Sequence, residues 1–198
     1  MNKRAILAGV GVVVAAVVAF FVYKAVSLQS AAAKWSGPMQ EIADEKITHD
    51  DRVTHARFVS ILDAPIMSVQ NAIWNVENSP QMVENIKAAK VLEANGNMKK
   101  VEMNFQSLNL PLQSFIMQWT LYPDEHRITF KTLKSQAQDI EGEYKLEPSP
   151  DGSKTQLTYT TTITDKIAMP IPQSVLDSAN RELYVNTVRG IQKTVKKG

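Results

Sequence analysis

Alternation of apolar and polar residues is the feature that most constrains how this chain of 198 residues can fold. Successive side chains of a β-strand point to opposite faces, so alternation gives a strand one apolar and one polar face. Met117 and Trp119, for example, are separated by Gln118 and followed by Thr120. Strands of this kind form antiparallel sheets with one face buried and the other in water. The pattern occurs in residues 98–106, 114–122, 139–147 and 154–164.

Turn sequences between these segments predict hairpins. Asn-Gly-Asn at 95–97 separates a strand over 89–94 from that over 98–106. Pro-Asp-Glu at 123–125 precedes a strand over 126–134, and a Pro- and Gly-containing turn at 148–153 joins the last two strands. An earlier strand is predicted over 52–62, followed by short helices over 66–76 and 80–86.

A long helix is predicted at the C-terminal end of the sequence. Residues 172–197 contain an apolar stripe with helical spacing, which includes Leu176 and Leu183. This helix and the two short ones are the segments available to cover the apolar face of the sheet. We therefore predict an α+β fold in which a curved antiparallel sheet of six to seven strands surrounds a long C-terminal helix.

The N-terminal segment has a different character. Ala5 to Tyr23 are nineteen residues without a charge, which as a helix would be roughly 28 Å long and close to the thickness of a bilayer core. We expect a transmembrane anchor over 1–26 and a tether over 27–52, followed by one domain over 53–198. A cleaved signal peptide is an alternative, although its apolar core is normally shorter. A buried soluble helix is a further alternative.

Charge indicates the orientation of this anchor and excludes one class of partner. Lys3 and Arg4 precede the apolar run, so the N-terminus is expected in the cytoplasm and the domain outside it. The absence of an Asn-x-Ser/Thr site favours a bacterial periplasm. Lys and Arg total 22 and Asp and Glu total 20, a balance too even for a nucleic-acid-binding protein. The sequence has no cysteine, which excludes disulfides and thiolate sites.

The order of these elements resembles the START-like or SRPBCC superfamily, which includes polyketide cyclase/dehydrase, lipid-transport and coenzyme Q-binding proteins. FVSILDAPIMSV at 58–69 is similar to the first strand and short helix of that superfamily, and ENSPQMVENIKAAKVLE at 77–93 to its second helix and strand. GEYKLEPSPDGSKTQLTYT at 142–160 resembles the last hairpin, and MPIPQSVLD at 169–177 the start of the final helix. The resemblance covers about residues 53–197. It implies a helix-grip fold with a hydrophobic cavity between sheet and helix, used for lipids, quinones, sterols or polyketides.

Side chains expected to point inward from the strands, and apolar side chains of the predicted C-terminal helix, are candidates for the cavity lining. The same residues could instead fill a closed core, and the tyrosine hydroxyls among them could either bond the backbone or orient a ligand head group. A loop at 165–172 is a candidate gate through Ile167, Met169 and Ile171, or a structural plug. The lining candidates are Met103, Phe105, Phe115, Met117, Trp119, Phe130, Tyr144, Tyr159, Leu176 and Leu183.

No catalytic or metal-binding pattern occurs in the sequence. The three histidines, His49, His55 and His126, form no ligand motif, and Glu141 and Glu143 lie on the polar phase of their strand. We therefore expect no catalytic residue, metal or cofactor. The expected function is membrane-tethered binding or transfer of a hydrophobic ligand: a lipid, quinone or polyisoprenoid. The alternatives are a polyketide cyclase/dehydrase-like enzyme and a ligand-free interaction module of a membrane complex.

Overall fold

The computed structural model describes residues 34–106, 111–167 and 171–196. The chain divides into two units, Met1–Pro38 and Met39–Gly198, and the fold described below is that of the second. The anchor predicted over 1–26 lies outside the described residues. Among the helices that are described, none is long and apolar enough to cross a membrane.

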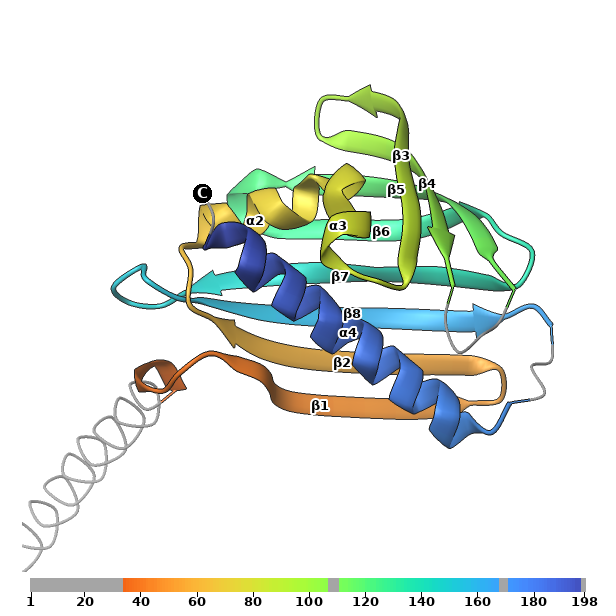
Figure 1. Cartoon of the computed structure of the whole chain (residues 1–198), viewed down its shortest axis with the longest axis horizontal. Coiled ribbons are helices and arrows are strands. Elements are labelled where there is room, and N and C mark those ends of the chain that lie inside the picture. The colour runs from red at the N-terminus through yellow and green to blue at the C-terminus, as the bar shows by residue number, and fades with distance from the viewer. Residues whose placement is uncertain (1–33, 107–110, 168–170, 197–198) are drawn as a thin grey trace, which may run out of the picture. The chain divides into compact units, whose positions relative to one another are not determined.

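The second unit contains one sheet of eight antiparallel strands in the order β1-β2-β8-β7-β6-β5-β4-β3 (Figure 1). Hairpins join most neighbours in this order, and the exception is the pairing of β2 with β8, which brings the two ends of the domain together. The strands are β1 (Gln40–Asp50), β2 (Val53–Leu62), β3 (Ile86–Asn95), β4 (Met98–Phe105), β5 (Gln113–Tyr122), β6 (Arg127–Lys134), β7 (Gln138–Pro148) and β8 (Thr155–Asp165).

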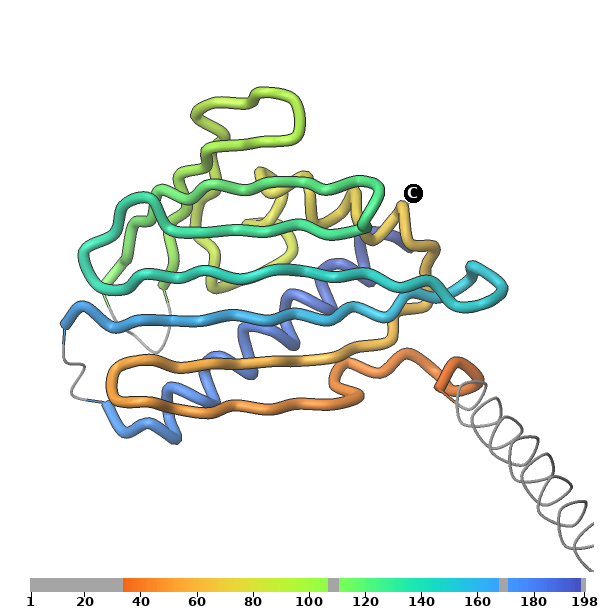
Figure 2. The backbone as a smooth tube through the Cα atoms, turned by 180° about the vertical axis from the view of Figure 1, so that it is seen from behind, coloured from red at the N-terminus to blue at the C-terminus, as the bar shows by residue number. Residues whose placement is uncertain are grey.

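The helices lie on one face of this sheet, and the view from behind shows the strands in front of them (Figure 2). The long helix α4 (Gln173–Val195) crosses the sheet diagonally, beside α2 (Ile66–Trp74) and the single turn α3 (Ser79–Met82). Two 3-10 turns, η1 (Val76–Asn78) and η2 (Pro123–Glu125), complete the unit. The predicted α+β helix-grip architecture is confirmed.

The predicted strand count and the predicted tether need correction. The sheet has eight strands rather than six to seven, because residues 40–50 of the expected tether form the edge strand β1. This strand pairs with β2 along its backbone and carries little apolar sequence, with Ile42 and Ile47 partly buried against the core. β1 is stabilised by its backbone hydrogen bonds to β2 and by contacts with α4. Neither can be recognised from the local sequence.

The apolar residues of the alternating strands are buried and the polar residues between them are partly exposed, as predicted. Phe115, Met117 and Trp119 of β5 are buried, whereas Gln118 and Thr120 are partly exposed. The inward side chains of the sheet and the inner faces of the helices form one hydrophobic cluster. Close packing continues where α4 crosses α3, since a Cβ atom on Gly190 would lie 2.5 Å from the carbonyl oxygen of Met82.

Candidate functional site

A cavity of about 210 Å³ lies between the inner face of the sheet and the helices α3 and α4. Its lining is mainly aliphatic and aromatic, as is usual for pockets that bind small molecules. All ten residues predicted from the strand phase and the helical stripe line it. They are Met103, Phe105, Phe115, Met117, Trp119, Phe130, Tyr144, Tyr159, Leu176 and Leu183.

Aromatic rings form a continuous wall of this cavity. Tyr159 of β8 occupies the centre, with its ring centroid 5.0 Å from that of Tyr144 and 5.6 Å from that of Tyr184. Phe58 of β2 stacks on Tyr184 at 4.7 Å. Phe58 and Tyr184 were missing from the sequence prediction. The alternation within residues 52–62 could have identified Phe58, because its neighbours Arg57 and Ala56 follow the same two-residue period.

Three tyrosine hydroxyls bring limited polarity to this wall. Ser60 donates a hydrogen bond to the carbonyl oxygen of Glu41, so the Tyr184 hydroxyl, 2.6 Å from Ser60 Oγ, acts as donor to it. Burial raises the pKa of Tyr159 to about 12 and raises the pKa of Tyr144 and Tyr184 as well. All three therefore remain protonated at neutral pH, as hydrogen-bond donors rather than bases.

Trp119 contributes an unusual polar atom to the same lining. The side chain is only 6% exposed, and its indole Nε1 has no hydrogen-bond partner among the described residues. Its nearest aromatic neighbours are Phe130, at 5.5 Å between ring centroids, and Tyr144, at 6.1 Å. Native proteins satisfy most buried donors, so this N–H is an exception.

Apart from the tyrosines, the described part of the cavity lining has no acidic or basic side chain: it contains no Asp, Glu, His, Lys or Arg. Its other polar members are the amides of Gln113, Gln138 and Asn180 and the hydroxyls of serine and threonine. Nothing in this lining could neutralise a buried charge, and an unpaired charge is costly to bury. The arrangement suits a neutral ligand. No cluster of potential metal ligands occurs within the described ranges.

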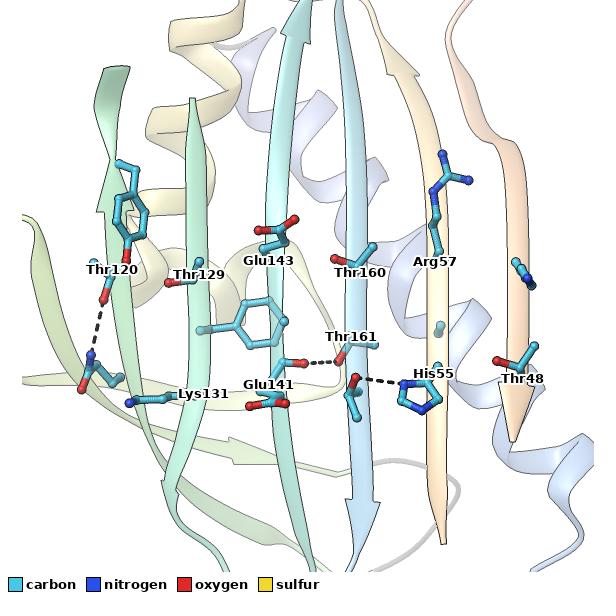
Figure 3. A pocket seen from close by; sticks show the side chains of 17 residues that line it. Thr48, His55, Arg57, Thr120, Thr129, Lys131, Glu141, Glu143, Thr160 and Thr161 are labelled. Atoms are coloured by element: carbon cyan, nitrogen blue, oxygen red, sulfur yellow. Dashed lines mark hydrogen bonds between the residues drawn. The ribbon is translucent and has the colours of Figure 1, made fainter. Parts of the chain in front are cut away.

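A second hollow, of about 660 Å³, lies on the outer face of the sheet. Figure 3 shows its hydroxyl and charged side chains standing on the strands, with the helices behind them. His55 is 3.1 Å from the hydroxyl of Thr162, and Glu141 and Glu143 point away from the inner cavity. His55, Glu141 and Glu143 belong to the polar phase of their strands, and their position explains why none of these three lines the inner cavity.

The other two histidines also lie apart from the inner cavity. His49 is 3.2 Å from the Asp177 carboxylate on α4, and His126 is 3.3 Å from Gln70 on α2. The first contact connects β1 to α4, and the second connects the turn before β6 to α2. The described histidines therefore contribute to packing between elements and do not meet at one site.

The gate candidates fall around the connection between β8 and α4. Ile167 is 54% exposed, Ile171 is partly buried, and Met169 lies outside the described residues. Neither Ile167 nor Ile171 lines the inner cavity. Whether this segment acts as a gate or a plug stays a prediction.

Comparisons with known proteins identify relatives of the fold. The sequence profile of a family described as polyketide cyclase / dehydrase and lipid transport matches residues 62–183. Among solved structures, the Zhui aromatase/cyclase from a Streptomyces species is 14% identical, with a TM-score of 0.65 over 73% of this chain and 94% of that chain. A START superfamily protein from Mycobacterium smegmatis is 14% identical, with a TM-score of 0.59 over 72% of this chain and 97% of that chain.

A third related structure is the lipid transfer and protein localization domain of human StarD13. It is 16% identical, with a TM-score of 0.60 over 88% of this chain and 96% of that domain. At these identities the similarity of the structures shows the fold alone. A search of curated proteins gives no match.

Proposed function

This chain belongs to the polyketide cyclase/dehydrase and lipid transport family, and from that premise we propose that it binds a neutral hydrophobic small molecule beneath α4. The observation that carries the proposal is the cavity of about 210 Å³, whose described lining is mainly apolar and aromatic and contains no carboxylate, histidine, lysine or arginine. A lipid, a quinone or a polyisoprenoid has the apolar surface that such a lining favours.

We propose binding or transfer rather than catalysis. General acid–base chemistry requires a group that changes protonation near the working pH. The cavity tyrosines have raised pKa values, and the described lining offers no carboxylate or histidine in their place. An enzymatic role is the alternative, because the Zhui aromatase/cyclase has the same fold.

We further propose that the protein is tethered to a membrane by residues 1–26, with the N-terminus in the cytoplasm and the domain in a bacterial periplasm. The uncharged run from Ala5 to Tyr23 and the preceding Lys3 and Arg4 support this part of the proposal. A tether of this kind would keep the cavity close to the bilayer in which apolar ligands dissolve.

The test is to purify the full-length protein gently from membranes and identify retained apolar molecules by mass spectrometry. In parallel, Ala179→Phe places a larger apolar side chain in the cavity from α4, where Ala179 lines it. We expect this variant to retain its melting temperature and lose the retained molecule. Gln118→Phe, on the opposite face of β5, is the matched control and should retain it.

Two results would contradict the proposal. Wild-type protein that retains no apolar molecule, and whose melting temperature no apolar compound raises, would favour the ligand-free interaction module. Equal retention by wild type and Ala179→Phe would place the ligand outside this cavity.

A further inference from the structure

The unpartnered indole N–H of Trp119 carries information about the ligand. Trp119 is in the middle of β5, opposite Phe130 of β6, and its side chain lines the inner cavity. A tryptophan buried in a protein usually finds an acceptor for this group. Here the described protein supplies none, although several positions of the same wall hold phenylalanine, which would fill similar space without a donor.

A second donor lies beside it. The rings of Trp119 and Tyr144 are stacked, with an angle of 21° between their planes and 6.1 Å between their centroids. Tyr144 faces the same cavity, and burial together with the neighbouring Tyr159 and Tyr184 raises the pKa of its hydroxyl, which therefore stays protonated. The two side chains form a pair of neighbouring donors in a wall that is mainly apolar.

The residues around Trp119 and Tyr144 determine whether this donor pair can bind a charged or a neutral acceptor group. A carboxylate or phosphate would also lose hydration on entering, and the described lining contains no lysine, arginine or histidine to offset that cost. A neutral carbonyl oxygen has acceptor lone pairs and a far smaller cost of desolvation. The donor pair therefore favours a ketone, quinone or ester over an anion and over a pure hydrocarbon.

We propose that the ligand carries a neutral carbonyl oxygen that accepts a hydrogen bond from Trp119 Nε1, with Tyr144 as the neighbouring donor. The inference rests on the proposed function and narrows it, since a quinone or an acyl lipid has such an oxygen and a polyisoprenoid chain does not. Nε1 is enclosed in the ligand-free protein, so the proposed bond requires the Trp119 ring to shift when the ligand enters.

The experiment uses the full-length chain in lipid nanodiscs, which accommodate the apolar N-terminal run. Two probes of matched shape are titrated: 2-acetylnaphthalene, which has a ketone, and 2-isopropylnaphthalene, which has a methyl group in place of the oxygen. The readouts are the dissociation constants and the indole N–H resonances of Trp35, Trp74 and Trp119 in proton–nitrogen correlation spectra. Trp119→Phe removes the donor and identifies its resonance, and Trp74→Phe is the matched control outside the cavity.

We expect the ketone to move the Trp119 indole proton downfield and the hydrocarbon not to do so. Trp119→Phe should weaken binding of the ketone about three- to tenfold, the range for one hydrogen bond, and change binding of the hydrocarbon less than twofold. Trp74→Phe should leave both constants unchanged. Tyr144→Phe should weaken the ketone selectively by a smaller factor.

The outcomes separate this inference from the proposed function. If both naphthalenes bind and Trp119→Phe weakens them equally, the cavity binds apolar ligands but the donor role of Trp119 is wrong. If neither naphthalene binds the wild-type protein, both the inference and the proposed ligand-binding function are overturned for ligands of this class.

Discussion

At the scale of single residues, the shape of the cavity wall depends on Gly142 of β7. It pairs with Phe130 on β6 and Thr161 on β8, and it belongs to the inward phase of its strand. A Cβ atom at this position would overlap the carbonyl oxygen of Thr160 and would lie 2.7 Å from Cζ of Phe130. The missing side chain thus lets the Phe130 ring lie over the strand and form part of the wall.

Gly142→Ala should therefore destabilise the protein. One of the two obstructing atoms belongs to the backbone of β8 and cannot move without disturbing the ladder, so we expect a loss of about 1–3 kcal/mol in the free energy of unfolding. Urea denaturation measures it. Gly152→Asn is the control, because Gly152 has a φ of 72° and open space around it, and should cost less than about 1 kcal/mol. Equal losses in both variants would contradict this role of Gly142.

The sequence predicted ten of the residues that line the cavity, but it did not predict the hydrogen-bond partners of individual side chains in that lining. The two-residue period identifies inward positions such as Met117 and Trp119 because neighbouring strands share one apolar face. The unpartnered state of Trp119 Nε1 depends on the absence of any nearby acceptor, which a strand pattern does not specify. The Tyr184–Ser60 bond joins residues 124 positions apart, so only the packing of α4 on β2 brings them together.

At the scale of elements, β1 is the part of the fold that the sequence did not indicate. It lies at the edge of the sheet and pairs only with β2. Besides the His49–Asp177 contact, two pairs of a glutamate with an arginine connect it to α4: Glu45 with Arg181 at 2.7 Å, and Glu41 with Arg189 at 2.6 Å. The Arg189 guanidinium lowers the pKa of Glu41 through this hydrogen bond. Such contacts join residues more than a hundred positions apart and leave no local periodicity.

Arg189→Gln should loosen this edge strand without unfolding the sheet. We expect the backbone amides of β1 to exchange hydrogen faster, because the strand loses one of its attachments to α4, while the amides of β7 and β8 keep their rates. Hydrogen–deuterium exchange with mass spectrometry measures both. Lys193→Gln, with the same change of charge at an exposed position four residues later, is the control. Faster exchange throughout the sheet would show that the pair contributes to global stability instead.

At the scale of the whole domain, exposed apolar side chains gather at one end of the sheet. Leu112 precedes β5, Leu133 is near the end of β6, Ile167 follows β8, and Val175 is in the first turn of α4, each between 39% and 54% exposed. The lining of the cavity reaches the same end through Gln113 and Gln138. An apolar rim at this end would allow a ligand to pass between cavity and bilayer without crossing water.

Replacing Leu133 and Ile167 together with serine should weaken binding to lipid vesicles. Inserting two half-exposed side chains of this size into a bilayer is worth about 1–2 kcal/mol, so we expect roughly a 5- to 30-fold loss of vesicle affinity. Residues 39–198, the compact second unit, are suitable for a flotation assay with phosphatidylcholine and phosphatidylglycerol vesicles. The melting temperature should change by only a few degrees, because both side chains are exposed in the folded protein.

The matched control is the double replacement of Leu92 and Met98 with serine. These side chains are 39% and 42% exposed, comparable to the rim, but they lie on the β3–β4 hairpin, which Figure 1 shows projecting away from α4. If both double variants lose affinity equally, general surface hydrophobicity accounts for vesicle binding. If neither does, ligand exchange at the bilayer does not use this rim. Loss confined to the Leu133 and Ile167 variant identifies this end of the sheet as the membrane-facing end, because nonspecific adsorption would depend on exposed apolar area rather than on its position.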